Sequence, residues 1–261
     1  MDIQEMEEIR CLSSSDGSSE PVLIFHPGGQ TPVPLVVGLH TWSYDRNNQV
    51  EGMLPLCRDR GWGLVLPEFR GPSLDTNPRA RQAGGSQVAV QDVLDAVADV
   101  TADYPVQKDA LFLLGGSGGG HMSLLVAASA PALWRGVSSW VPITDLSAWH
   151  EQNPDYASHI AACCGGAPGS SERVDNEYRE RSPITKVDAL SRVNLSLHHG
   201  RFDPVVSYSH SWKLAQELER LGSRQFFFDI FDGEHDIGYD TAFRWFEALL
   251  KKENQGGRLT G

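Results

Sequence analysis

The sequence predicts an α/β fold with one doubly wound, mostly parallel sheet and a helical lid insertion. Three observations support this prediction. Short apolar runs alternate with longer segments of helical periodicity along most of the 261 residues. The apolar runs are continuous, which is typical of parallel strands that are covered on both faces. A glycine-rich segment follows one of these runs in mid-chain, where a strand gives way to a helix.

The predicted elements follow one another in a regular order. A turn-rich segment at 13–19 precedes a short apolar run at 22–25. Helices are expected where apolar residues recur at three- and four-residue spacing, and strands where short apolar runs end at turn-forming residues. Further strands are predicted at 34–39, 64–66, 110–114, 136–141, 193–198 and 225–231, and helices at 48–60, 87–102, 121–129, 208–221 and 237–251.

Residues 143–191 interrupt this alternation. They are rich in tryptophan, glycine, proline and charge, and a segment of this length inside a compact domain is usually functional. We therefore expect one domain over residues 1–261, with a lid or insertion at about 143–191 above the sheet. Residues 256–261 are expected to form a frayed tail.

The composition argues against several kinds of partner. A formal net charge of −12 disfavours nucleic acid and anionic membranes, because both require a basic footprint. The four cysteines have no zinc-ligand spacing, so free thiols are expected, although the adjacent Cys163 and Cys164 allow a strained disulfide. The sequence implies neither a metal nor an organic cofactor, and it leaves the oligomeric state open.

The N-terminal residues 1–5 are acidic and lack the charged-then-apolar pattern of a secretory signal. No apolar run approaches the roughly 18 residues of a membrane span. A cytoplasmic protein is therefore expected, although a secreted chain whose signal peptide had been removed would look the same.

The strongest local signal is Gly115-Gly116-Ser117-Gly118-Gly119, which matches the pattern G-x-S-x-G. A predicted strand precedes it and a helix of small residues follows it. Such a sharp turn lifts the serine hydroxyl to the top of the sheet, and the flanking glycines avoid collisions. A phosphate-binding loop would need Gly-Lys-Ser/Thr, which this segment lacks, and a glycine-rich packing turn is the other alternative. We predict Ser117 as the nucleophile of an α/β-hydrolase.

A serine nucleophile needs a base and an acid that orients the base. In α/β-hydrolases the acid and then the histidine follow the serine along the chain. His235 comes directly after the last predicted strand and is the predicted base. Asp203 follows the preceding strand, from which it can reach the imidazole, and is the predicted acid. Asp145, which follows the strand at 136–141, is the competing acid.

The other histidines after the serine are expected to have different positions or roles. His121 lies on the helix after the turn and cannot curl back. His150 and His159 lie in the predicted lid. His198 and His199 end a strand, where a structural role is expected for both.

Backbone N–H groups must stabilise the oxyanion that forms during acyl transfer. Gly118, next after the predicted nucleophile, is the first expected donor. The second should come from the loop after the strand at 34–39, with Trp42 as our choice and Thr41 as its near rival. His40, which ends that strand, is expected to organise the loop.

These motifs together resemble the catalytic domain of the prolyl oligopeptidase family and the related small carboxylesterases, over about residues 30–250. The resemblance implies an acyl-enzyme mechanism with a triad of Ser117, Asp203 and His235. At the oxyanion loop, family members often have His-Gly-Gly or a similar small-residue pattern, whereas this chain has His40-Thr41-Trp42. The other shared segments are Pro67-Glu68-Phe69-Arg70-Gly71, Ser182-Pro183, His199-Gly200, Asp203-Pro204-Val205 and Gly233-Glu234-His235.

The predicted function is hydrolysis of a small-molecule carboxylic ester, with acetyl or feruloyl esters of carbohydrates as candidates. The choice of ester over peptide depends on the short segment of about thirty residues before the first core strand. Peptidases of this family usually carry a large N-terminal propeller, which such a segment cannot form. The alternatives are an aminopeptidase or dipeptidase with the same triad, a dienelactone-type hydrolase, which would usually use cysteine, and a non-catalytic binding protein of the same fold.

Aromatic residues in or near the lid are candidates for the substrate pocket. They are Trp140, Trp149, Tyr156 and Tyr178, and packing of the lid onto the sheet is the alternative for each. Arg70 is a candidate for binding an acidic substrate group, but an ion pair that holds its own loop is the favoured interpretation.

Overall fold

The computed structural model describes residues 5–256 and confirms the predicted fold class. Its centre is an eight-stranded sheet in the order β1-β2-β4-β3-β5-β6-β7-β8. β2 pairs antiparallel with both β1 and β4, and all other pairs are parallel. The strands are β1 Glu7–Leu12, β2 Ser19–Phe25, β3 Val33–Leu39, β4 Gly63–Pro67, β5 Val106–Gly116, β6 Gly136–Trp140, β7 Leu195–Gly200 and β8 Phe226–Phe231.

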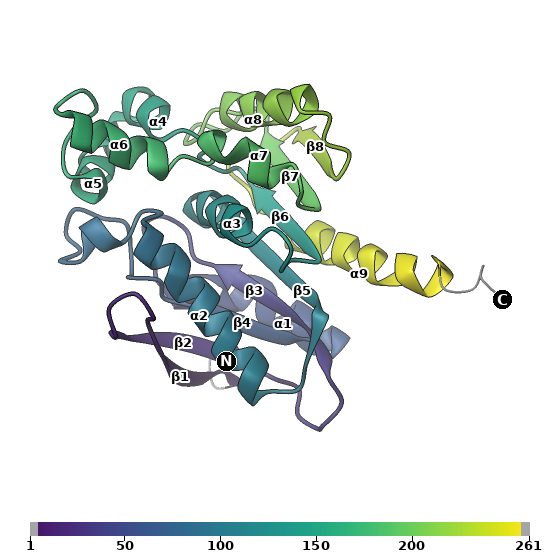
Figure 1. Cartoon of the computed structure of the whole chain (residues 1–261). Coiled ribbons are helices and arrows are strands. Elements are labelled where there is room, and N and C mark those ends of the chain that lie inside the picture. Colours follow the sequence, from purple (N-terminus) through teal and green to yellow (C-terminus); the bar gives the residue numbers. More distant parts are fainter. Residues whose placement is uncertain (1–4, 257–261) are drawn as a thin grey trace.

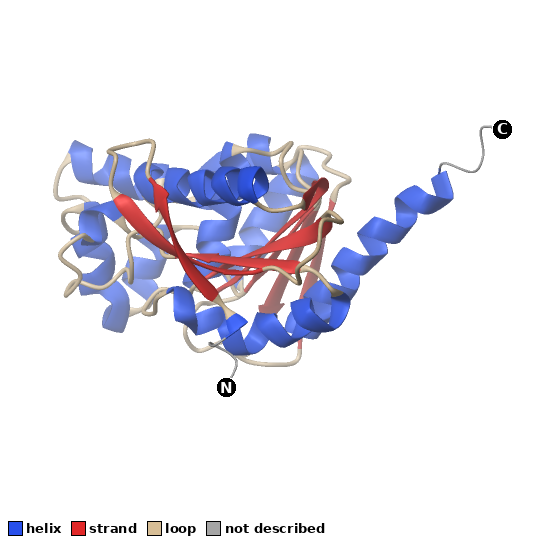
Figure 2. Ribbon diagram, turned by 90° about the horizontal axis from the view of Figure 1, so that it is seen from below, coloured by secondary structure: helices blue, strands red, loops and turns tan. Residues whose placement is uncertain are grey.

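Helices cover both faces of the twisted sheet (Figure 2). α2, α3 and α8 contribute to the core on one face, and α1 and α9 to the core on the other (Figure 1). Between β6 and β7 the chain forms the shorter helices α4 to α7. The helices are α1 Val50–Arg60, α2 Gln87–Asp103, α3 Gly118–Ser129, α4 Leu146–Gln152, α5 Pro154–Cys164, α6 Glu172–Glu180, α7 Val187–Leu190, α8 Ser209–Arg220 and α9 Tyr239–Gly256.

The central strands contain continuous apolar runs because the side chains of these runs enter two different cores. On β5, Leu111 and Leu113 belong to the core under α2, α3 and α8. Phe112 and Leu114 belong to the core under α1 and α9. Successive side chains of a strand point to opposite faces, so a strand segment covered on both faces can be apolar at consecutive positions. The loops that follow the parallel strands lie at the carboxyl ends of these strands.

The residues predicted as an insertion form α4 to α7, and α4, α5 and α6 lie together at one end of the molecule (Figure 1). They pack around a third apolar cluster, which includes Trp149, Ile160 and Tyr178. Cys163 and Cys164 are buried in the same cluster as free thiols, so the alternative of a disulfide between them is wrong.

Local signals explain where several helices begin and end. Ser86 precedes α2 and accepts the N–H of Ala89 at 3.1 Å, as an N-cap should. Gly61 ends α1 with a φ of 64°, a left-handed conformation that favours glycine. The helix predicted at 121–129 begins three residues earlier, directly after Ser117, because the glycines there form its first turn.

The tail predicted at 256–261 lies outside the described residues except for Gly256, which ends α9. Among the helices of residues 5–256, none is both long and apolar enough to cross a membrane.

Candidate active site

Ser117 forms the sharp turn between β5 and α3. Its φ of 56° and ψ of −122° lie in a region that residues other than glycine rarely adopt. Its N–H donates to the carbonyl of Trp140 at 2.9 Å, and its own carbonyl accepts the N–H of His121 at 2.9 Å. A Cβ at Gly115 would lie 2.1 Å from the carbonyl oxygen of Gly119, so the turn requires glycine there. The surrounding structure thus holds the serine in a strained conformation, which is typical of functional sites.

Asp203 and His235 meet beside the carboxyl ends of β7 and β8. The Nδ1 atom of His235 lies 2.6 Å from Oδ2 of Asp203. The two loops approach closely because β7 ends at Gly200, where a Cβ would lie 1.9 Å from the carbonyl oxygen of Glu234. Since Nδ1 is bound to the carboxylate, Nε2 is the ring nitrogen that remains for proton exchange with a hydroxyl.

Asp203 is fully enclosed and well supplied with hydrogen-bond donors. Its Oδ1 accepts the N–H groups of Val205 at 2.8 Å and Val206 at 2.9 Å. Its Oδ2 lies 3.3 Å from Nε2 of His199. Burial alone would raise the pKa of Asp203, but hydrogen bonds from His199, His235 and the Val206 amide outweigh it, so this pKa lies well below its usual range. The carboxylate is therefore ionised at neutral pH.

One cavity of about 370 Å³ contains both the serine and the histidine. Among the described residues no hydrogen bond joins Ser117 to His235, and such bonds often tighten only when substrate is bound. The walls are otherwise aromatic, aliphatic or uncharged polar. The cavity is lined by Thr41, Trp42, Ser43, Tyr44, Asn48, Ser117, Val141, Tyr156, His235 and Ile237.

The loop after β3 presents a backbone N–H beside the serine turn. A Cβ at Gly118 would lie 2.4 Å from the backbone nitrogen of Trp42, so the two segments touch. The N–H of Thr41 donates to Oδ1 of Asn48 at 3.1 Å and is thereby occupied. Within residues 5–256, neither the N–H of Trp42 nor that of Gly118 donates to a protein acceptor. Of the two rival donors, Trp42 is thus the one that remains available.

Asp145, His40 and Arg70 make contacts that hold helices and loops in place. Asp145 caps α4 by accepting the N–H of Ala148 at 3.1 Å, whereas the carboxylate that binds His235 in the described residues is that of Asp203. His40 lies between the carbonyl oxygens of Thr41 and Glu68, at 2.9 and 2.8 Å, and so organises the loop. Arg70 is buried and pairs with Asp92, Asp16 and Glu20 rather than lining the cavity, which agrees with the favoured interpretation of a loop-holding ion pair.

Of the four aromatic candidates for the substrate pocket, Tyr156 lines the cavity, whereas Trp140, Trp149 and Tyr178 do not. Trp140 is buried and stacks on His198 with ring centroids 3.9 Å apart. Trp149 is fully buried and donates from Nε1 to the carbonyl of Val205 at 3.0 Å. Tyr178 is also buried, with its hydroxyl bound to the carbonyl of Gly166. These three side chains pack the interior, so we no longer assign them to the substrate pocket.

No pattern in the sequence pointed to Tyr44, Asn48, Val141 or Ile237 as wall residues. Each lies shortly after the end of a strand, which is the usual location of binding residues in such sheets. Val141 has a φ of 42°, which is exceptional for a β-branched residue and marks backbone strain at the cavity wall.

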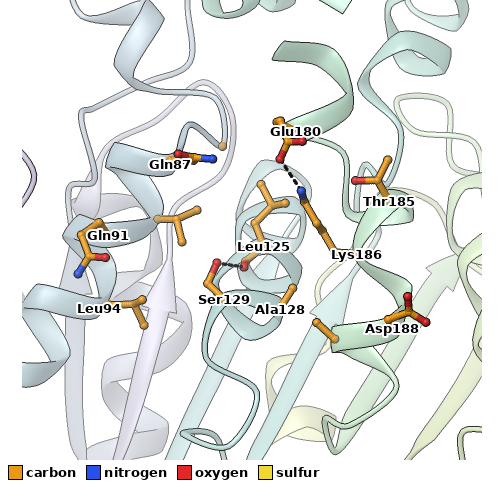
Figure 3. Close-up of a pocket in the computed structure, with 13 residues that line it drawn as sticks. Gln87, Gln91, Leu94, Leu125, Ala128, Ser129, Glu180, Thr185, Lys186 and Asp188 are labelled. Carbon is orange, nitrogen blue, oxygen red and sulfur yellow. Dashed lines mark hydrogen bonds and ion pairs between the residues drawn. The ribbon is translucent and has the colours of Figure 1, made fainter. Parts of the chain in front are cut away.

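A second, larger cavity of about 530 Å³ lies between α2, α3 and the segment 180–189 (Figure 3). Figure 3 shows Glu180 facing Lys186, and the two side chains form an ion pair of 2.6 Å. Leu94 and Leu125 form part of its apolar wall. None of the three predicted triad residues lines this cavity, so it is distinct from the candidate active site.

Most of the chain matches one protein-family model. The family model described as the prolyl oligopeptidase family matches residues 49–253, which is most of the chain. The chain belongs to the prolyl oligopeptidase family. In this member of the prolyl oligopeptidase family, the sheet has the α/β-hydrolase arrangement, and the predicted triad residues occupy loops after β5, β7 and β8.

Proteins and solved structures that are similar to this chain carry peptidase names. "Uncharacterized peptidase YtmA" of Bacillus subtilis (strain 168) is 31% identical over 165 residues, which cover 62% of this chain and 60% of that protein. "Inactive dipeptidyl peptidase 10" of Rattus norvegicus is 24% identical over 173 residues, which cover 64% of this chain and 20% of that protein. A puromycin-hydrolyzing peptidase of Mycobacterium tuberculosis superposes with a TM-score of 0.74 at 23% identity, over 96% of this chain and 40% of that one.

These comparisons bear on the predicted reaction. The matches span about 60% of the Bacillus relative and smaller shares of the others, so the activity of a whole relative does not transfer directly. The carboxylesterase prediction finds no support in them, and the peptidase alternative fits better. The ester prediction depended on the length of a segment and on no side chain that contacts a substrate.

Proposed function

We propose that the chain is a serine peptidase that cleaves an amide bond next to an uncharged, apolar side chain. The observation that carries this proposal is the placement of Ser117 and His235 on one cavity, with His235 bound to Asp203 at 2.6 Å. A nucleophile, a base and an orienting acid in this order are the groups that acyl transfer requires.

The reaction proceeds in two halves. The hydroxyl of Ser117 attacks the substrate carbonyl while Nε2 of His235 accepts its proton. His235 then protonates the leaving amine, and an acyl-enzyme remains on the serine. In the second half His235 activates water, which releases the acid and restores the serine. Asp203 holds the imidazole in the correct tautomer and stabilises its protonated form.

The N–H groups of Gly118 and Trp42 stabilise the oxyanion of each tetrahedral intermediate. Both N–H groups border the serine turn, and neither donates to another described residue. Donors that are already in place when negative charge develops contribute strongly to such reactions.

The cavity walls support an uncharged, apolar side chain beside the scissile bond. Trp42, Tyr44, Tyr156, Val141 and Ile237 form the aromatic and aliphatic part of the lining. No aspartate, glutamate, lysine or arginine is among the described residues that line this cavity. A charged substrate side chain would lose its hydration there without gaining a partner.

Labelling by a fluorophosphonate probe tests whether the site is catalytic. We expect covalent labelling of the wild-type protein and of Ser43→Ala, which removes another serine hydroxyl from the same cavity. Ser117→Ala should not be labelled. A wild-type protein that resists labelling would instead support a non-catalytic binding protein.

A matched panel of substrates tests the proposed bond and side chain. Anilides and phenyl esters that carry the same blocked Phe, Lys or Glu residue are compared at equal concentration. We expect turnover of the Phe anilide, and a kcat/KM for it at least tenfold above the Lys and Glu anilides. Hydrolysis of the esters without any anilide turnover would contradict the peptidase proposal and favour a carboxylesterase.

A further inference from the structure

Two adjacent histidines, His198 and His199, precede the last residue of β7 and point to opposite faces of the sheet. His198 stacks on Trp140, in the core under α9. His199 lies toward α8, where it contacts Ser211. Both side chains are buried, yet only His199 approaches the candidate active site.

The hydrogen bonds of His199 fix its tautomer. Nε2 lies 2.8 Å from the carbonyl oxygen of Val206, which can only accept, so Nε2 carries the proton. Nδ1 lies 2.7 Å from Oγ of Ser211, which can donate its hydroxyl proton. A neutral ring therefore satisfies both contacts, and its N–H points into the Asp203 loop.

The same N–H lies beside the carboxylate of Asp203. Nε2 of His199 is 3.3 Å from Oδ2, the oxygen that also binds His235 at 2.6 Å. Val206 links the same two residues, because its carbonyl accepts from His199 while its N–H donates to Oδ1 of Asp203 at 2.9 Å. His199 thus contacts the carboxylate directly and also through the Val206 peptide unit.

We propose that His199 is a positioning residue that orients the Asp203 carboxylate toward His235 and offsets part of its charge. This inference rests on the proposed function, because it assigns His199 to the same triad. Without the N–H of His199, the carboxylate can rotate and carries more uncompensated negative charge. More charge on Asp203 stabilises the protonated form of His235, in which the base is inactive.

Other titratable groups face this cluster and must be considered in a pH profile. His210 on α8 interacts with His199 and Asp203, and its neighbours Asp145 and Lys213 act on it as well. Burial lowers the pKa of His210 to about 4, so this residue stays neutral over the range of interest. Glu234 and Asp236 flank His235 in its own loop.

Three variants test the proposal by the pH dependence of kcat/KM on the substrate that the wild-type protein cleaves. His199→Asn removes the donor at the Nε2 position, whereas His199→Gln places an amide N–H near it. His198→Asn is the matched control, since it changes a buried histidine of the same strand that faces away from Asp203.

For His199→Asn we expect the acid limb of the kcat/KM profile to move to a pH higher by about half a unit, because His235 is protonated more easily. At the plateau, kcat should fall roughly tenfold with little change in KM, since His199 does not line the cavity. His199→Gln should recover most of both effects, and His198→Asn should leave the acid limb in place. Equal displacement by the His198 and His199 variants, or none in His199→Asn, would overturn the proposal.

A second variant and a second readout keep the test decisive. If His199→Asn does not fold, Ser211→Ala replaces it, because this change loosens the far side of the ring and should shift the acid limb in the same direction. The proton between His235 and Asp203 should give a low-field NMR signal in the wild-type protein that broadens or moves in the His199 variant. An unchanged signal contradicts the inference, whereas a wild-type protein without hydrolytic activity contradicts the proposed function itself.

Discussion

The side-chain Oδ1 of Asn48 accepts the backbone N–H of Thr41 at 3.1 Å. This bond ties the loop after β3 to the chain segment before α1 and occupies the N–H of Thr41, the rival of Trp42 as the proposed oxyanion donor. The position of the Trp42 amide therefore depends on a side chain that also lines the cavity.

Replacing Asn48 should impair catalysis more than binding. In Asn48→Leu the Thr41 amide loses its acceptor and the loop can shift, so the Trp42 donor is misplaced. We expect kcat to fall by about 10²-fold, the scale of losing one oxyanion donor, in steady-state assays on the preferred anilide. Asn47→Leu is the control, because Asn47 is exposed and bonds only within its own turn to Asp45. An equal loss in both variants would count against this role.

Gly200 should be essential for assembling the triad. The Cβ in Gly200→Ala would lie 1.9 Å from the carbonyl oxygen of Glu234, and backbone must move to accept it. The loop that moves carries His235, so we expect at least a 10²-fold fall in kcat/KM with the circular dichroism of the folded protein retained. Gly63→Ala, whose Cβ would lie 2.9 Å from a leucine side chain on β3 and no nearer than 3.6 Å to backbone, should keep far more activity. Similar activity in the two variants would contradict this reasoning.

Tyr156 should influence the choice of substrate. Tyr156→Ala enlarges the cavity from the side of α5 and removes aromatic surface that would cover an apolar side chain. We expect KM for the Phe anilide to rise about tenfold, with a smaller change for an Ala anilide. Tyr208→Ala removes an equally large but exposed ring outside this cavity and should change neither value. Parallel losses on the Phe and Ala substrates would argue against a specificity role.

Three buried histidines should make the fold sensitive to mild acid. Burial lowers the pKa of His121, His198 and His210 to about 4 each. In the unfolded chain a histidine takes up a proton near pH 6.5, so the folded state binds fewer protons between these values. Stability is therefore fully present above about pH 6.5 and is lost as the pH falls toward 4. Each histidine contributes a slope of up to about 1.4 kcal/mol per pH unit.

Urea unfolding at pH 7.5, 6 and 5 measures this loss directly. The unfolding free energy should decline at each step, and His210→Gln should reduce the slope because one titrating group is gone. A free energy of unfolding that stays constant from pH 7.5 to 5 would show that these rings do not titrate as inferred.

The fold was predictable because its central strands contain continuous apolar runs and several of its helices, such as α2, have apolar residues at helical spacing. Parallel strands bring their carboxyl ends to one edge, so residues directly after β5, β7 and β8 had to lie near one another. That reasoning brought Ser117, Asp203 and His235 together from the sequence, although their catalytic roles remain proposals. The carboxylesterase prediction lacked such a basis, since segment length says nothing about the chemistry of a bond.

The walls of the cavity could not be predicted in the same way. An aromatic residue near a loop is compatible with a core position and with a pocket wall. Trp149 is buried in the core, whereas Tyr156 lines the cavity, and the sequence pattern does not distinguish the two. The contact of Asn48 with Thr41 and that of His199 with Asp203 depend on how loops fold back on each other. Side-chain periodicity carries no information about such contacts.

The order of the triad along the chain has a consequence for biosynthesis. Ser117 lies before the middle of the sequence, whereas His235 follows β8, the edge strand that pairs only with β7. A ribosome that adds roughly 5–20 residues per second needs about 6–24 seconds to pass from the serine to the histidine. Until β8 joins the sheet, the growing polypeptide holds a serine without its base. Under the proposed mechanism, such a polypeptide would have no base to activate Ser117 and would therefore not attack other nascent chains while it is being made.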